Sequence, residues 1–321
     1  MPAPVTQSDT RGLGLVAATF TAFHANGALN LSAIERQAEE LVRQRLRGVF
    51  VCGTSGEFAS LTVPERMEIA RRWRDVAGPD LEIIVHVGHT SLGDAQALAA
   101  HAEQIGAAGI AAVGPYYFRP RAVPEVVDFS ARIAAAAPNT PFSYYHIPSF
   151  TGVALPMAEF LPAAATTIPT FAGLKFTHEN LAEYAHCVAY ENGRYEIFFG
   201  RDEMLLGALA MGASSGVGTT YNYSAPIFQR VYEAFKRGDM DEARHWQGLA
   251  IAMIEIAVAH GGMPAFKAMM RWFGVDCGPC RPPLVSLDDD QAARLHAELS
   301  EIGFLDAVSS STEPASATVA D

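Results

Sequence analysis

Apolar residues gather in eight short runs along the chain, separated by longer stretches with helical periodicity. Short apolar runs closed by glycine or proline are typical of buried strands. The eight runs span residues 13–20, 48–51, 82–88, 109–115, 142–147, 171–176, 196–200 and 215–219. The clearest amphipathic segments between them are 32–44, 63–77, 92–105, 123–137 and 181–191. The first of these is expected to open with a capping box formed by Ser32 and Glu35.

This alternation predicts an α/β fold. Eight strand–helix units fit a (β/α)8 TIM barrel over residues 13–237, and a doubly wound open sheet is the alternative. Further helices are expected at 241–260, 264–273 and 288–302, forming a C-terminal helical appendage that packs on the barrel over 238–305. The polar or Ser/Thr/Ala-rich ends, 1–12 and 306–321, are expected to be flexible tails.

Composition and charge narrow the function classes. The 321 residues contain 23 Lys plus Arg and 35 Asp plus Glu, a formal net charge of −12. So acidic a chain is a poor partner for nucleic acid or an anionic membrane. No segment has the pattern of a signal peptide or a membrane span, so we expect a cytoplasmic protein with a small-molecule substrate. Four cysteines do not form a disulfide framework, and Cys277 and Cys280 lie in a proline-rich loop that favours a structural use.

Lys175 is the most informative residue, because it lies inside the apolar run 171–176. Only three of the 23 basic residues are lysines. Burial disfavours the charged amine and lowers a lysine pKa. A neutral amine is the nucleophile that forms Schiff bases with carbonyl substrates. The alternative is a strand-end lysine whose charged head reaches water.

Further polar residues stand at the ends of predicted strands, where barrel active sites form. The turn GTSGE at 53–57 presents backbone N–H groups that suit a carboxylate, unless its hydroxyls only cap the next helix. Tyr145 ends the fifth strand, where a hydroxyl facing an imine could move protons, or it is a core tyrosine. The acids of GRDE at 200–203 could hold sugar hydroxyls or cap a helix.

Histidines and cysteines show no spacing that indicates a metal site. His86 and His89 are three positions apart, and on a strand such positions point to opposite faces, so they make a poor ligand pair. We therefore expect no metal and no organic cofactor, which disfavours a zinc-dependent aldolase.

Five motifs, taken together and in this order, resemble those of the pyruvate-dependent class I aldolases, the family that includes N-acetylneuraminate lyase and dihydrodipicolinate synthase. They are GTSGE at 53–57, YYHIPSFTG at 144–152, GLKFT at 173–177, GRDE at 200–203 and GTTYN at 218–222. The resemblance extends from Gly12 to Phe304. It implies a barrel fold, an aldol cleavage through a Schiff base, and a homotetramer.

The resemblance also implies a role for individual residues. Lys175 would form the Schiff base and Tyr145 would handle protons. Thr54 would link Tyr145 to a second tyrosine, Tyr117, which in the family often comes from a neighbouring subunit. Ser55 would bind the substrate carboxylate together with the backbone of its turn.

Substrate choice within the family depends on a few positions. Phe150 stands where the synthase branch has a carboxylate-binding arginine, which argues against that branch. The residues that match those holding the glycerol tail of sialic acid in the lyase branch are Gly200, Asp202, Glu203 and Thr219, although serine is usual at the last. Other positions expected to contact the substrate or to affect specificity are Thr177, Phe58 and His178.

The expected substrate is therefore N-acetylneuraminate, cleaved to N-acetylmannosamine and pyruvate. Another 2-oxo acid, such as a 2-keto-3-deoxy sugar acid or an aromatic aldol, is the alternative for a related aldolase or dehydratase. A non-catalytic protein that binds sugar acids on the same scaffold is a third hypothesis.

Overall fold

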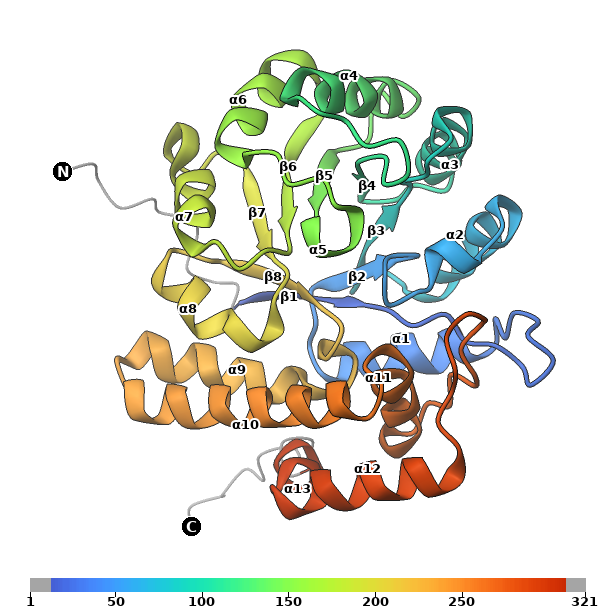
Figure 1. The fold of residues 1–321 in the computed structure, drawn as a ribbon, viewed down its shortest axis with the longest axis vertical. Coiled ribbons are helices and arrows are strands. Elements are labelled where there is room, and N and C mark those ends of the chain that lie inside the picture. Colours follow the sequence, from blue (N-terminus) through green and yellow to red (C-terminus); the bar gives the residue numbers. More distant parts are fainter. Residues whose placement is uncertain (1–12, 310–321) are drawn as a thin grey trace, which may run out of the picture.

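Eight parallel strands close into a barrel in chain order in the computed structural model, which describes residues 13–309 (Figure 1). β1 pairs with both β2 and β8, so the sheet has no edge. This confirms the predicted (β/α)8 fold and excludes the open sheet. The strands are β1 (Gly14–Ala18), β2 (Gly48–Val51), β3 (Glu82–His86), β4 (Gly109–Val113), β5 (Phe142–His146), β6 (Phe171–Phe176), β7 (Glu196–Phe199) and β8 (Ser215–Gly218).

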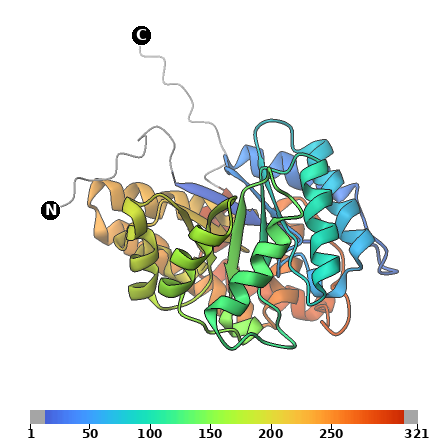
Figure 2. The same cartoon turned by 90° about the horizontal axis from the view of Figure 1, so that it is seen from above.

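An outer ring of helices covers the barrel (Figures 1 and 2). It consists of α1 (Ala33–Arg43), α2 (Val63–Val76), α3 (Leu92–Gln104), α4 (Val123–Ala134), α6 (Met157–Thr167), α7 (Leu181–Ala189), α8 (Leu205–Ala210) and α9 (Tyr221–Arg237). The five helices expected between strands are all present. We did not predict bounds for α6, α8 or α9, nor for the short α5 (Pro148–Thr151).

The predicted capping box at the start of α1 is wrong. Ser32 already has helical backbone angles, and its hydroxyl donates to Asn30 Oδ1 at 2.7 Å instead of accepting from the helix. Capping boxes do open α2, with Thr62 and Glu65, and the later helix α12 (Asp289–Glu301). An N-cap needs an extended backbone conformation, which the S/T-x-x-E pattern alone does not guarantee.

The helices that follow the eighth unit stack against α9 in further layers (Figure 1). They are α10 (Met240–Ala259), α11 (Met263–Met269) with the 3-10 turn η4 (Met270–Phe273), α12 and α13 (Phe304–Ser309). Residues 306–309, which we assigned to a tail, complete α13, where Val308 is buried. The rest of the two predicted tails lies outside the described residues. Within 13–309, no single helix is long and apolar enough to cross a membrane; α10 with α11 and η4 passes only as a pair bent by 117°.

Alternation along each strand separates the inside of the barrel from the layer beneath the helices. The inner cluster includes Phe50, Ile84, Ala111, Tyr145 and Phe198. In the sheet register, Tyr145 on β5 stands beside Lys175 on β6, which stands beside Phe198 on β7. The predicted lysine and tyrosine therefore point to the same side of adjacent strands, into the barrel.

Candidate active site

Lys175 is enclosed between two aromatic rings near the C-terminal end of β6. Its Nζ lies 3.9 Å from the ring centroid of Phe50 and 4.1 Å from that of Tyr145, and only 4% of the residue is exposed. Burial lowers the pKa of the amine from 10.5 to about 7, although the carboxylate of Asp202 opposes this shift. A large fraction of this amine is thus uncharged near neutral pH, the form that attacks a carbonyl carbon.

Tyr145 brings a hydroxyl to the same place. Its Oη lies 3.2 Å from Thr54 Oγ1, which belongs to the turn after β2. Burial raises the pKa of Tyr145 to about 12, while the hydroxyls of Thr54 and Thr177 favour the phenolate and limit the rise. The phenol therefore keeps its proton at neutral pH and can pass protons along a chain of hydroxyls.

A second hydroxyl pair lies beside Thr54. Ser55 Oγ and Thr219 Oγ1, after β2 and β8, are 2.7 Å apart. Ser55 is buried, and Thr219 is half-buried. We expected Thr219 at the sugar tail and Ser55 at the carboxylate, so the two residues are closer together than those separate roles suggest.

Asp202 is buried at the barrel wall and engaged by the start of α9. Its Oδ2 accepts hydrogen bonds from the backbone N–H of Thr220 at 2.9 Å and from the Thr220 hydroxyl at 2.7 Å. Burial raises its pKa to about 6, against the effect of these hydrogen bonds. Asp202 does not cap its own 3-10 turn η3 (Asp202–Met204), as the helix-cap alternative supposed. The side chain instead anchors the neighbouring helix and adds negative charge near Lys175.

The remaining predicted tail residues surround this position. Gly200 packs under the hydroxyl of Thr177, where an added Cβ would collide with Oγ1. Glu203 is half-buried and pairs with Arg201 at 3.3 Å. A sugar tail binding here would therefore have to compete with Arg201 for the Glu203 carboxylate.

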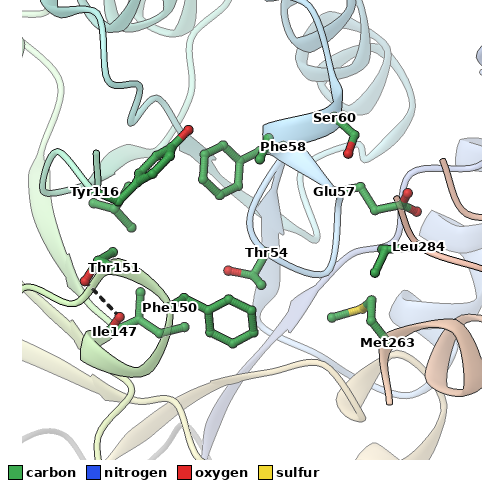
Figure 3. A pocket seen from close by; sticks show the side chains of 12 residues that line it. Thr54, Glu57, Phe58, Ser60, Tyr116, Ile147, Phe150, Thr151, Met263 and Leu284 are labelled. Atoms are coloured by element: carbon green, nitrogen blue, oxygen red, sulfur yellow. Dashed lines mark hydrogen bonds between the residues drawn. The ribbon is translucent and has the colours of Figure 1, made fainter. Parts of the chain in front are cut away.

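An adjoining cavity of about 270 Å³ opens beside Thr54 (Figure 3). Its lining is mainly apolar, and Phe58 and Tyr116 face each other across one side at 6.2 Å between ring centroids. Phe150 from α5 and Met263 from α11 complete it (Figure 3). The C-terminal helices therefore contribute directly to the neighbourhood of the site.

A buried ion pair joins those helices to the Thr54 turn. Lys267 Nζ on α11 donates to Glu57 Oε1 at 2.6 Å, and each side chain is only 1% exposed. Glu57 Oε2 accepts from the backbone N–H of Arg281, and Lys267 also donates to the carbonyl of Pro279. We missed this contact because Glu57 and Lys267 are far apart in sequence and each fits an ordinary surface pattern.

The loop between η4 and α12, which supplies Pro279 and Arg281, also contains the two cysteines of the CxxC motif. Cys277 and Cys280 are free, and burial raises their pKa values to about 12 and about 11. A thiol that stays protonated is a poor redox nucleophile.

Tyr117 does not join the site within one chain. It is 77% exposed in the loop after β4, where its ring packs on that of Phe118, itself 87% exposed. Among the described residues, Thr54 Oγ1 contacts the hydroxyl of Tyr145, and the hydroxyl of Tyr117 makes no hydrogen bond to it.

The Dihydrodipicolinate synthetase family model matches residues 12–302, nearly the whole chain. The chain belongs to this family. Its members are pyruvate-dependent class I aldolases, and this protein is a carbon–carbon lyase of that class.

Two comparisons place the chain within the family. It is 38% identical to the N-acetylneuraminate lyase of Mus musculus, over 91% of this chain and 93% of that protein, and 39% identical to the one of Gallus gallus, over 91% and 97%. The solved structure of Proteus mirabilis N-acetylneuraminate lyase superposes with a TM-score of 0.89 at 37% identity, covering 91% of this chain and 98% of that one. The sialic acid aldolase of Aliivibrio salmonicida gives the same TM-score at 39% identity, covering 91% and 97%.

Proposed function

We propose that this family member cleaves N-acetylneuraminate to N-acetylmannosamine and pyruvate through a Schiff base on Lys175. The observation that carries the proposal is the buried amine of Lys175 held against the ring of Tyr145, whose hydroxyl contacts Thr54. Relatives that share 38–39% of its residues are named N-acetylneuraminate lyases, which supports this substrate.

The reaction begins when Lys175 Nζ attacks the C2 ketone of the open-chain sugar acid and water leaves. The resulting imine accepts the electrons of the C3–C4 bond as that bond breaks, and the C4 hydroxyl gives up its proton to form the aldehyde of N-acetylmannosamine. Because Tyr145 retains its own proton, it acts as a relay between the C4 hydroxyl and the substrate carboxylate. The enamine is then protonated and hydrolysed to pyruvate, which frees Lys175.

The Ser55 hydroxyl and the backbone N–H groups of Thr54 and Ser55 would bind the carboxylate end of the substrate. Asp202 and Glu203 would meet its polyhydroxylated tail, with Gly200 leaving room and Thr177 beside the imine. Binding the tail through Glu203 requires this carboxylate to exchange Arg201 for sugar hydroxyls.

The lining of the adjoining cavity favours a second candidate substrate. Apolar and aromatic side chains predominate there, among them Phe58, Tyr116 and Phe150. An aromatic aldol would bury its ring against such side chains, whereas a sugar tail would leave hydroxyls without partners. The same Lys175 chemistry would cleave either substrate.

Pyruvate release from a panel of 2-oxo acids distinguishes the two substrates. The panel contains N-acetylneuraminate, a 2-keto-3-deoxy sugar acid and an aromatic aldol, compared by kcat/KM. We expect the highest value for N-acetylneuraminate; a higher value for the aromatic aldol would replace the first candidate with the second.

Borohydride trapping tests the Schiff base independently of substrate choice. Reduction in the presence of pyruvate should attach a stable adduct to Lys175, located by mass spectrometry. The chain offers only Lys236 and Lys267 as other lysines, so an adduct on either, or none at all, would refute the assignment.

We also infer that the chain assembles as a homotetramer in which Tyr117 approaches Thr54 of a neighbouring subunit. Tyr117 and Phe118 are large aromatic side chains that are mostly exposed in one chain, which supports a subunit interface at this loop. Light scattering gives the assembly state. Mixing inactive Tyr117→Phe and Lys175→Met variants should restore part of the activity if tyrosine and lysine act across subunits, and no recovery would contradict the shared site.

A further inference from the structure

A cluster of two histidines and a glutamate lies behind the two catalytic strands. His146 is the last residue of β5, and its ring points away from the barrel interior into the helix layer, where it packs 5.3 Å from Phe176. His178 follows β6 in the next loop, and Glu183 lies in the first turn of α7. One ligand atom from each residue lies within 4.8 Å of those of the other two.

Two imidazole nitrogens in this cluster have no partner. The Nδ1 atoms of His146 and His178 are buried and make no hydrogen bond to any described residue. His146 is only 1% exposed. Buried polar atoms normally have partners, because leaving one unpaired costs about 1–3 kcal/mol. A species bound between these nitrogens would remove that cost.

Neighbouring residues orient the two imidazoles and the carboxylate for binding a cation. The carboxylate of Glu179 lies 3.8 Å from Nε2 of His178, which favours the proton on that nitrogen and leaves a lone pair on Nδ1. Glu183 Oε1 accepts from the backbone N–H of Met157 at 2.6 Å, which fixes the carboxylate. The ring of His146 is held between those of Phe176 and His178, at 5.3 and 5.5 Å between centroids, while its Nδ1 has no hydrogen-bond partner among the described residues.

We propose that His146, His178 and Glu183 bind one Zn²⁺ ion, which braces β5, β6 and α7 from outside the barrel. Two imidazoles and a carboxylate are a ligand set that zinc accepts, with water in a fourth position. Zn–N and Zn–O distances of about 2.0–2.2 Å require the ligand atoms to approach one another. Half-buried His178 and Glu183 lie in a loop and a first helical turn, where small rotations can achieve this.

This site revises the expectation that the histidines are scattered without ligand geometry. His146 and His178 lie on different strand ends, so their separation in sequence concealed the contact. The ion would not touch substrate, because His146 points outward from a strand on which Tyr145 points inward. It would instead steady the two strands that carry Tyr145 and Lys175.

Zinc titration of chelator-stripped protein tests the site. Calorimetry should show one Zn²⁺ per chain for the wild type, with binding at least about ten-fold weaker in His178→Gln and Glu183→Gln. Glu183→Gln keeps an oxygen for the Met157 N–H, so it should fold. His89→Gln, which removes a histidine near Asp94 outside the cluster, is the matched control and should bind as the wild type does.

Thermal unfolding and activity complete the test. Saturating Zn²⁺ should raise the Tm of the wild type and of His89→Gln by about 2 °C or more and leave the two cluster variants unchanged. No binding by the wild type, or equal binding by all four proteins, would overturn the site. Pyruvate release lost on stripping and regained with Zn²⁺ would overturn the structural role.

Discussion

Replacing Lys175 with methionine should stabilise the protein while abolishing catalysis. Methionine keeps an unbranched chain between Phe50 and Tyr145 but carries no charge to desolvate. Lowering the lysine pKa from 10.5 to about 7 corresponds to about 5 kcal/mol of folding free energy, at about 1.36 kcal/mol per pH unit. The pKa of about 7 already includes the attraction of Asp202, and about half of the amine is still charged at pH 7, so this figure is an upper bound for the gain.

The pH dependence of the stability gained by Lys175→Met tests whether burial of the amine is its cause. Because the pKa of Lys175 is lower in the folded protein, the unfolded chain binds a proton that the folded chain lacks between about pH 7 and pH 10.5. Above about pH 10.5 the amine is neutral in both states, and its burial does not lower the free energy of unfolding. As pH falls from 10.5 towards 7, the unfolded chain takes up the proton and the protein loses this stability. The advantage of Lys175→Met over the wild type should therefore be about 2 kcal/mol larger at pH 7 than at pH 9.

Urea unfolding at these two pH values, at one protein concentration, measures the difference. Lys236→Met is the matched control, since Lys236 is exposed on α9, and it should change stability equally at both pH values. An advantage of Lys175→Met that does not depend on pH would show that Lys175 is charged in the folded protein, and the argument for a neutral nucleophile would fail.

Three further changes probe the rest of the site. Tyr145→Phe should lower kcat by about 10²–10⁴-fold with little change in borohydride trapping of pyruvate, because the hydroxyl acts in proton transfer; a kcat near that of the wild type would contradict this role. Asp202→Asn should move the pH midpoint of borohydride trapping to lower pH, since the carboxylate raises the pKa of Lys175, and an unmoved midpoint would separate the two residues. Lys267→Met should cost about 3–5 kcal/mol in urea unfolding by leaving Glu57 unpaired, and adding Glu57→Gln should recover much of that loss; additive losses would indicate that the ion pair is not coupled.

The amino-acid sequence by itself predicted the alternation of eight strands with helices and indicated the residues of the candidate site. Buried parallel strands are continuous apolar runs, so each of the eight strands could be predicted near its true bounds. Lysine in such a run is chemically unusual, which identified Lys175 without any knowledge of its neighbours. The turn around Thr54 and the tyrosine motif of β5 could be assigned to the candidate site because they lie at strand ends, where barrel active sites form.

Only the tertiary structure decided which side chains meet. Asp202 matches a sugar-binding residue in sequence, yet its carboxylate is held by Thr220 and acts on Lys175 across adjacent strands. The Glu57–Lys267 pair and the His146–His178–Glu183 cluster join residues from different elements. Periodicity reports the environment of one segment at a time, whereas closing the barrel brings distant strand ends within a few ångströms. Charge, hydrogen bonding and ligand geometry arise from that closure.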